Sequence, residues 1–352
     1  MQAHSTTPTI LHFSTGRYLR GGERQIRFLH SGLEAKGFHS ILACRKGGEL
    51  AAQTLQNSVA IPWLGEWDTI GLARLIALCK QIEPVLIHSH DGHALAHASV
   101  AGATLGIPVI YTRRVIFALH PSVVSRWKYN SCKALIGVSH AVARMCKEAF
   151  PEVRVHIVHD GVEWNADSPT QQEARKELGI GNDAFAIGTV THFTKEKCLD
   201  LFISLARSLM QSFPSARIVC IGPMPQRPPA FPSNMIVCGF RPNATRYYRA
   251  FDAYVSASSH EGLGSALLDA IVRDIPCVAI DAGGTRDLFP VGTALVAADD
   301  EKGLSDAVMS LISTYENAAR VAAVFGTRAR DMFSVDTMVS RTIDVYKTVV
   351  RL

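Results

Sequence analysis

Short apolar runs alternate along the whole chain with segments whose apolar positions recur every three or four residues. The runs are typical of strands and the recurring segments of helices. Predicted strands in the first half are Thr9–Ser14, His39–Cys44, Val85–Ser89, Pro108–Thr112, Ala134–Val138 and Val155–His159. Those in the second half are Ala184–Thr189, Arg217–Ile221, Met235–Cys238, Ala253–Ser256, Cys277–Ile280 and Ala294–Val296. Predicted helices include Gln25–Lys36, Leu199–Gln211, Ser265–Arg273 and Lys302–Thr314. This alternation predicts parallel sheets with helices on both faces.

A polar segment at 161–172 interrupts the alternation and is interpreted as a linker between domains. The 352 residues are enough for two ordinary domains. We therefore expect an α/β protein with two doubly wound, Rossmann-like domains, residues 1–165 and 166–335. Ligands of such domains bind at the carboxyl ends of the strands, which places the predicted site in a cleft that both domains face.

The segment 258–289 carries the strongest chemical signal. Its pattern predicts a glycine loop containing Glu261, Gly262, Leu263 and Gly264, followed by a helix that Ser265 caps and that contains Asp269. The glycines allow a close approach of backbone N–H groups to an anion, and the two carboxylates can accept hydrogen bonds from sugar hydroxyls. These features together predict a nucleotide-sugar site. The alternative is a surface loop and a helix, each with one solvated acid.

Other candidate residues also follow predicted strands. Gly21 and Gly22 stand between the first strand and the first helix, where a simple turn is the alternative. His90 ends a strand, and we prefer it to His88 as a ligand-binding histidine. The alternatives there are a core histidine and a helix cap formed by Asp91.

The segment 188–200 contains His192 and Lys197, and Lys197 is a candidate for binding diphosphate, with a plain surface lysine as the alternative. Gly239 and Phe240 follow a later strand and are expected to border a base pocket. None of these residues specifies which base is bound.

Segment 258–289 resembles the donor site of the retaining glycosyltransferases of family four, which have the GT-B fold. Asp269 replaces the second acid of that family's E-x7-E motif. Gly21-Gly22 resembles its N-terminal glycine motif, and residues 188–200 resemble its G-x-V-G-R-x-x-x-E-K-G element. There, His192 stands for the usual arginine and Cys198 for the usual glycine, and histidine cannot make the bidentate contact of an arginine.

The resemblance implies transfer of a sugar from a nucleoside diphosphate sugar to an acceptor hydroxyl, with no metal and no other cofactor. It implies that Glu261 and His90 hold the transferring sugar, that Lys197 binds the pyrophosphate and that Asp269 binds the ribose. The last helix, within 336–352, would join the first domain, which presents the acceptor. The segments HDGHALA and YTRRV resemble a bacterial branch that acts on lipopolysaccharide core or other envelope glycans. A GT-B epimerase and an inactive sugar-nucleotide-binding protein remain the alternatives.

The net charge of +5 is unevenly distributed. Residues 110–154 contain eight Lys or Arg against two Glu, and Phe117 and Trp127 lie among them. Such a face suits a polyanionic or glycolipid acceptor, or peripheral contact with an anionic membrane, although a solvated basic surface is the alternative. Nucleic acid is not expected, because no binding motif accompanies the charge. Scattered cysteines, with no signal peptide or membrane-spanning run, predict a cytoplasmic protein.

Overall fold

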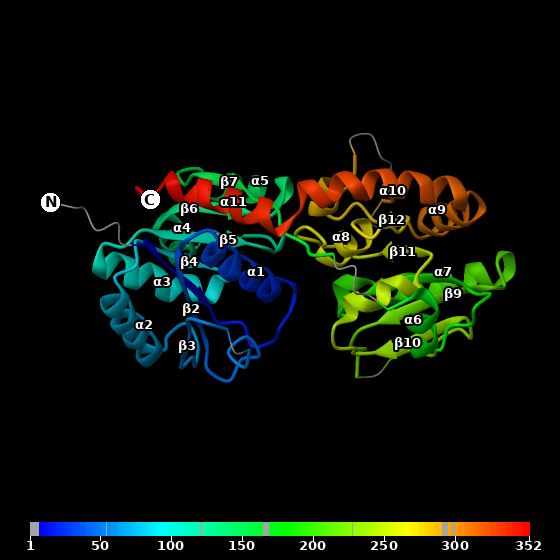
Figure 1. The fold of residues 1–352 in the computed structure, drawn as a ribbon, viewed down its shortest axis with the longest axis horizontal. Helices are drawn as coiled ribbons and strands as arrows, with labels where there is room; N and C mark the ends of the chain where they lie inside the picture. Colours follow the sequence, from blue (N-terminus) through cyan, green and yellow to red (C-terminus); the bar gives the residue numbers. More distant parts are fainter. Residues whose placement is uncertain are drawn as a thin grey trace. The chain divides into compact units, whose positions relative to one another are not determined.

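A computed structural model describes residues 7–53, 55–119, 122–164, 169–226, 228–290, 295–297 and 300–352 of the chain. The chain forms two compact units (Figure 1). Unit 1 comprises residues 1–161 and 335–352, and unit 2 comprises residues 162–334. Unit 1 therefore includes the C-terminal helix.

Unit 1 is built on a parallel sheet, and its order within the described residues is β3-β2-β1-β4-β5-β6-β7. The strands are β1 Thr9–Ser14, β2 His39–Arg45, β3 Ser58–Ile61, β4 Leu86–Ser89, β5 Val109–Arg113, β6 Cys132–Gly137 and β7 Val155–Ile157. The helices are α1 Gly21–Ala35, α2 Thr69–Ile82, α3 Gly92–Leu105, α4 Val123–Asn130, α5 His140–Ala149 and α11 Val335–Lys347. Strand order reverses between β1 and β4, so the loops that follow these two strands diverge and leave a crevice at the carboxyl edge.

The C-terminal helix α11 is part of the core of unit 1. Val339, Ile343 and Tyr346 are buried with Leu29 and Leu33 of α1. A Cβ atom added to Gly32 of α1 would lie 2.5 Å from Val339 Cγ2, so glycine allows the two helices to approach closely. Figure 1 shows α11 in red beside the unit 1 elements.

Unit 2 has a smaller parallel sheet, whose order in the described part of the chain is β10-β9-β8-β11-β12. The strands are β8 Phe185–Val190, β9 Ala216–Ile221, β10 Met235–Gly239, β11 Ala253–Ser256 and β12 Cys277–Ala279. The helices are α6 Gln171–Leu178, α7 Leu199–Ser212, α8 Ser265–Ile271, α9 Glu301–Ser313 and α10 Tyr315–Met332, with 3-10 turns η1 Lys195–Lys197, η2 Ala244–Ala250 and η3 Gly284–Leu288. Here the order reverses between β8 and β11, which gives this sheet its own crevice.

The predicted strands correspond to observed strands with ends that differ by one or two residues, apart from the last one. Ala294 lies outside the described residues, and Val296 forms an isolated bridge with Ile280. Strand β3 was not predicted, because its sequence SVAI is short and half exposed. All eight cysteines are free thiols, and five of them are buried.

Candidate functional site

The central feature of unit 2 is an ion pair between Lys197 and Glu261. Lys197 Nζ donates to Glu261 Oε1 at 2.5 Å, and the two side chains are only 23% and 17% exposed. Lys197 ends the turn η1, which follows β8, and Glu261 lies in the loop after β11. Strands β8 and β11 are adjacent and parallel, so their carboxyl ends bring these loops together at the crevice of the sheet.

Backbone hydrogen bonds fix both partners of this pair. Ser259 N donates to Glu196 O at 2.9 Å, which ties the η1 turn to the loop that carries Glu261. On the other side, Gly284 N donates to Glu261 O at 2.9 Å, and Glu261 forms a parallel bridge with Gly283. The loop that contains Glu261 is thus held at both edges by main-chain contacts.

The glycine loop leads directly into α8. Gly262, Leu263 and Gly264 are buried, and Gly264 has a φ of +98°, a conformation that favours glycine. The prediction that Ser265 caps this helix was wrong, because Gly264 occupies the N-cap position and Ser265 is the first helical residue. The left-handed turn needed at residue 264 moves the helix start by one position.

Asp269 lies on the buried side of α8. Its side chain is 4% exposed and forms an i,i+4 ion pair with Arg273, at 3.4 Å between Oδ1 and NH1. Arg273 NH1 also donates to Asp269 O at 2.8 Å, and its guanidinium lies over the ring of Tyr248. The Asp269 carboxylate is therefore held in place by the Arg273 guanidinium.

The other predicted donor residues follow β8 and β10. His192 is exposed two residues after β8, and Cys198 takes a left-handed conformation with a φ of +51° between η1 and α7. Gly239 ends β10 with a φ of +66° and Phe240 is 72% exposed. Gly222 N donates to Gly239 O at 2.8 Å, which connects the ends of β9 and β10.

Unit 1 gathers a second set of predicted residues at its own crevice. Gly21 and Gly22 open α1 after β1, and His90 follows β4, the neighbouring strand. Gly22 lies near Arg114, whose Cδ would be 3.7 Å from an added Cβ. Arg114 follows β5, and its Nε donates to Asp160 Oδ1 at 3.1 Å.

His90 is held in a chain of buried polar groups. Arg114 NH1 lies 3.4 Å from His90 Nδ1, and His90 Nε2 lies 2.9 Å from His12 Nδ1. Because arginine can only donate, His90 Nδ1 must accept, and its proton is therefore on Nε2 and points to His12. Burial is the main cause that holds the pKa of His90 well below its usual range, with further contributions from His88, His12 and Arg114. The imidazole is therefore neutral near pH 7.

His88 has a structural role. Its Nδ1 contacts Tyr346 Oη of α11 at 2.6 Å, and its Nε2 contacts Thr112 Oγ1 at 2.7 Å, so both ring nitrogens are paired. His90 also has partners on both ring nitrogens and is only 6% exposed, so this pairing does not decide which of the two histidines has a role at the crevice. His88 instead fastens the C-terminal helix to the sheet.

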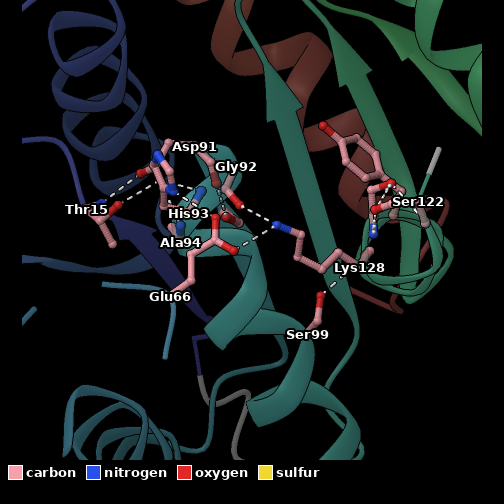
Figure 2. Close-up of polar contacts among 12 residues, drawn as sticks. Thr15, Glu66, Asp91, Gly92, His93, Ala94, Ser99, Ser122 and Lys128 are labelled. Atoms are coloured by element: carbon pink, nitrogen blue, oxygen red, sulfur yellow. Dashed lines mark hydrogen bonds and ion pairs between the residues drawn. The ribbon is translucent and has the colours of Figure 1, made fainter. Parts of the chain in front are cut away.

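Asp91 caps α3, which was the alternative interpretation of the HSHD sequence. It accepts hydrogen bonds from Ala94 N at 2.7 Å and His93 N at 3.1 Å, and from Thr15 N at 2.7 Å (Figure 2). Thr15 follows β1, so the Asp91 carboxylate joins the two loops that diverge at the strand-order reversal.

One ring nitrogen from each of His12, His88 and His90 lies within 4.8 Å of the other two. Three ligands of one metal ion would need such a spacing. The pairing of His88 with Tyr346 and Thr112 leaves it no lone pair directed at a common point. The permanently charged Arg114 next to His90 further disfavours a cation. The arrangement is better suited to positioning His90 than to holding a metal.

The predicted basic face of residues 110–154 needs correction. Arg113 is 7% exposed and donates to Tyr129 Oη and Phe117 O. The Arg114 side chain is 12% exposed in its pair with Asp160, and that of Lys128 is 13% exposed in its pair with Glu66. These three cations satisfy internal acceptors. The other five cations of the segment are exposed, namely Arg126, Lys133, Arg144, Lys147 and Arg154.

Asp160 is a functional candidate that sequence reasoning missed, and its partner Arg114 was counted only as part of the basic face. They are 46 residues apart and share no local motif, so pairing follows only from the positions of β5 and β7 in the sheet. Their one sequence signal is that each follows a predicted strand at its carboxyl end, as His90 does.

Two parallel α/β units, each with candidate residues at the crevice of its sheet, define the architecture of a GT-B protein. Family models agree with this class. Residues 19–164 match the model described as Glycosyltransferase Family 4, and residues 182–314 match the model described as Glycosyl transferases group 1. The chain therefore belongs to the glycosyltransferases that these two models, Glycosyltransferase Family 4 and Glycosyl transferases group 1, describe.

Solved structures with this fold include HepE of Anabaena in complex with UDP and glucose, at a TM-score of 0.83 and 16% identity. That match covers 97% of this chain and 100% of HepE. WaaG, a glycosyltransferase involved in lipopolysaccharide biosynthesis, is similar with a TM-score of 0.70 and 13% identity, over 96% of this chain and 99% of WaaG.

Among curated proteins, the chain is 24% identical to LpsB, a lipopolysaccharide core mannosyltransferase of Rhizobium meliloti, over 58% of this chain and 63% of LpsB. It is 26% identical to TuaC, a putative teichuronic acid glycosyltransferase of Bacillus subtilis, over 60% of this chain and 56% of TuaC. The alignments thus span about six-tenths of these relatives. Among the described residues, no helix is both long and apolar enough to cross a bilayer.

Proposed function

We propose that this protein is a retaining glycosyltransferase that moves a sugar from a nucleoside diphosphate sugar to an acceptor hydroxyl. The observation that carries this proposal is the Lys197–Glu261 ion pair at the crevice of unit 2. A cation and a hydroxyl-accepting carboxylate within 2.5 Å can together bind a diphosphate and the adjoining sugar. The complexes of HepE with UDP-glucose are consistent with such a donor.

In the proposed reaction the donor rearranges this pair. The diphosphate becomes the partner of Lys197, and Glu261 is released to accept hydrogen bonds from the sugar hydroxyls. As the bond to the sugar breaks, negative charge grows on the leaving diphosphate, and Lys197 with His192 stabilises it. The incoming hydroxyl attacks from the face that the diphosphate leaves and gives its proton to an oxygen of the leaving diphosphate, so the anomeric configuration is retained. No metal ion is required for these steps.

We assign donor binding to unit 2 and acceptor binding to unit 1, where neutral His90 contacts the sugar. Asp269 would bind ribose only after its pairing with Arg273 loosens, so its role depends on movement of the arginine. Gly21, Gly22, Gly239 and Phe240 would line the ligands. We place the reaction at the cytoplasmic membrane face, in the synthesis of lipopolysaccharide or another envelope glycan, as the names of LpsB and TuaC suggest.

Incubation of the purified protein with a panel of labelled nucleotide sugars tests the proposal. Sugar transfer or slow donor hydrolysis, with retained anomeric configuration by NMR, supports it. Inversion at C2 without an acceptor indicates the epimerase, and binding without any turnover indicates an inactive sugar-nucleotide-binding protein.

A further inference from the structure

Arg114 of unit 1 has a fixed orientation because buried groups hold it. Its Nε donates to Asp160 Oδ1 at 3.1 Å, and its NH1 group lies 3.4 Å from His90 Nδ1. The Arg114 and Asp160 side chains are only 12% and 10% exposed. A guanidinium is planar, and its five N–H donors keep a fixed geometry. The bond from Nε to Asp160 therefore sets the direction in which NH1 meets His90.

The hydrogen bonds of His90 run in one direction. Because Arg114 can only donate, His90 Nδ1 carries the lone pair and His90 Nε2 carries the proton. His90 Nε2 then donates to His12 Nδ1 at 2.9 Å, which places the proton of His12 on its Nε2. Burial is the main cause that lowers the pKa of His12 to about 3 and that of His90 well below its usual range, so each ring carries one N–H near pH 7. One donor at the end of the chain thus sets two tautomers.

No other described contact selects this direction. The contact between His12 and His90 is one hydrogen bond whichever ring donates. His12 is fully buried, and its Nε2 has no hydrogen-bond partner among the described residues, so that nitrogen is unpaired with or without a proton. Reversal would turn a His90 Nδ1–H toward the guanidinium, with donor facing donor beside a permanent positive charge. The tautomers of both histidines therefore depend on Arg114.

The Nδ1 edge of His90 is the edge that faces the crevice. Its Nε2 edge faces His12, which lies within β1 and is 0% exposed. On the other side, Arg114 lies beside Gly22 in the first turn of α1, where an added Cβ would be 3.7 Å from Arg114 Cδ. The 3.4 Å contact of Nδ1 is longer than most hydrogen bonds, whereas the 2.9 Å contact of Nε2 is typical. Nδ1 thus keeps a lone pair that a ligand hydroxyl can share.

We propose that Arg114, held by Asp160, is a positioning residue that keeps His90 Nδ1 as a hydrogen-bond acceptor for a substrate hydroxyl at the crevice of unit 1. The inference rests on the proposed function and deepens it, because it states what His90 recognises. A neutral imidazole with its lone pair toward the ligand binds a group that donates, such as a sugar hydroxyl. It rejects a group of similar size that only accepts. Arg114 acts through His90 and sets this preference.

The tautomers are measured on the full chain without ligand, by nuclear magnetic resonance of histidine rings labelled with nitrogen-15. Protonated and unprotonated ring nitrogens resonate at clearly different frequencies, and His90→Gln and His12→Gln identify the signals. We expect both rings of the wild type to be protonated on Nε2. In Arg114→Met both should shift together toward protonation on Nδ1, because only one ring donates across their contact. Arg114→Lys, which keeps a cation that only donates, should retain the wild-type tautomers, and Arg126→Met, at an exposed cation of α4, is the matched control.

The double variant Arg114→Met/Asp160→Asn replaces Arg114→Met if the single variant does not fold. It also removes the buried carboxylate that the single variant leaves without its cation. Wild-type tautomers in the variant that folds overturn the proposal, and so does a wild-type His90 that is protonated on Nδ1.

Turnover supplies a readout that a purely structural role would not move. The nucleotide sugar that the labelled panel selects is compared with its monofluorinated analogues, in which fluorine replaces one hydroxyl and cannot donate. One analogue should lose about tenfold or more in kcat/KM with the wild type, as expected for one hydrogen bond, and clearly less with Arg114→Met. Equal losses in both proteins overturn the proposal. A wild type without turnover counts against the proposed function alone, because the tautomer measurement needs no donor.

Discussion

Lys197 and Glu261 are 64 residues apart in the chain, yet their side chains meet at 2.5 Å in a partly buried ion pair. Each was a candidate from its own sequence segment, and the parallel neighbours β8 and β11 explain why the two segments meet. If Lys197 binds the donor diphosphate, as we propose, the Glu261 carboxylate competes with the diphosphate for the same cation.

This competition predicts opposite effects of Glu261→Gln on binding and turnover. Binding of the nucleoside diphosphate alone should tighten up to about fivefold, since an ion pair that still reaches solvent is worth about 1 kcal/mol or less. Turnover should fall about a hundredfold, because the carboxylate no longer holds the sugar in the transition state. Calorimetric titration and kcat measure the two effects. Glu177→Gln, which removes an exposed ion pair with Arg246 in the same unit, is the control and should change neither.

Replacement of His192 by arginine tests the phosphate-binding role of that loop. His192→Arg should tighten nucleoside diphosphate binding by about 1 kcal/mol or more, because arginine makes a bidentate, permanently charged contact. Calorimetric titration of both proteins with UDP and with GDP measures this change. Equal affinities would place His192 away from the phosphate.

Cys198 occupies a left-handed position, where the G-x-V-G-R-x-x-x-E-K-G element that this segment resembles has glycine. Its φ of +51° and ψ of 56° cost a non-glycine residue about 1 kcal/mol. Cys198→Gly should therefore raise the free energy of unfolding by about 0.5–1 kcal/mol, whereas Cys198→Ala should not. Chemical denaturation measures both variants. Glu83→Gly, at another exposed helix end with a left-handed conformation, should be stabilising in the same way. If Cys198→Gly is less stable than the wild type, the backbone at residue 198 is not strained.

The fold could be predicted from alternating apolar patterns because buried parallel strands leave a clear periodic signal. The positions of Lys197 and Glu261 after strands could also be predicted, since glycines and charges follow the apolar runs there, whereas their roles stay predictions. The pairing of Asp269 with Arg273 and of Arg114 with Asp160 was not predicted. The first depends on which side of a short helix is buried, and the second on sheet order. The exposure of Arg113, Arg114 and Lys128 in the basic segment was misjudged, because charge counts do not distinguish an exposed cation from one that satisfies buried acceptors.

Three buried histidines in unit 1 predict a loss of stability in mild acid. Burial, with smaller contributions from His30 and Arg114, lowers the pKa of His12 to about 3 from its ordinary 6.5, and the pKa values of His88 and His90 are also well below that value. At a pH between these lowered pKa values and 6.5, the unfolded chain binds protons at the three histidines that the folded chain does not. Stability is therefore retained above about pH 6.5 and falls as pH decreases, by about 1.4 kcal/mol per pH unit for each histidine.

Thermal unfolding of the wild type and of His12→Gln between pH 7.5 and 5 measures this effect. The free energy of unfolding of His12→Gln should fall less steeply with decreasing pH than that of the wild type. The difference in slope should correspond to about one bound proton, whatever the stability of the variant at pH 7.5. Val321→Gln, at an exposed position without a titratable group, serves as the control and should keep the wild-type slope. Parallel slopes in all three proteins would show that His12 is not buried in its neutral form.

The pair of Arg114 and Asp160 predicts a stability role for an arginine that sequence reasoning assigned to the surface. Burial raises the pKa of Asp160, and Arg114 opposes that shift together with Arg24. Arg114→Gln should therefore lower the free energy of unfolding by about 2 kcal/mol or more, because a buried carboxylate loses its nearest cation. Adding Asp160→Asn to this variant should restore part of the loss, since the orphaned charge is removed as well. Arg126→Gln, which neutralises an exposed cation on α4, should leave stability within about 0.5 kcal/mol of wild type. If Arg114→Gln is as stable as the wild type, Arg114 does not stabilise Asp160 and belongs to the exposed basic face. Binding to anionic vesicles would then be the property to measure.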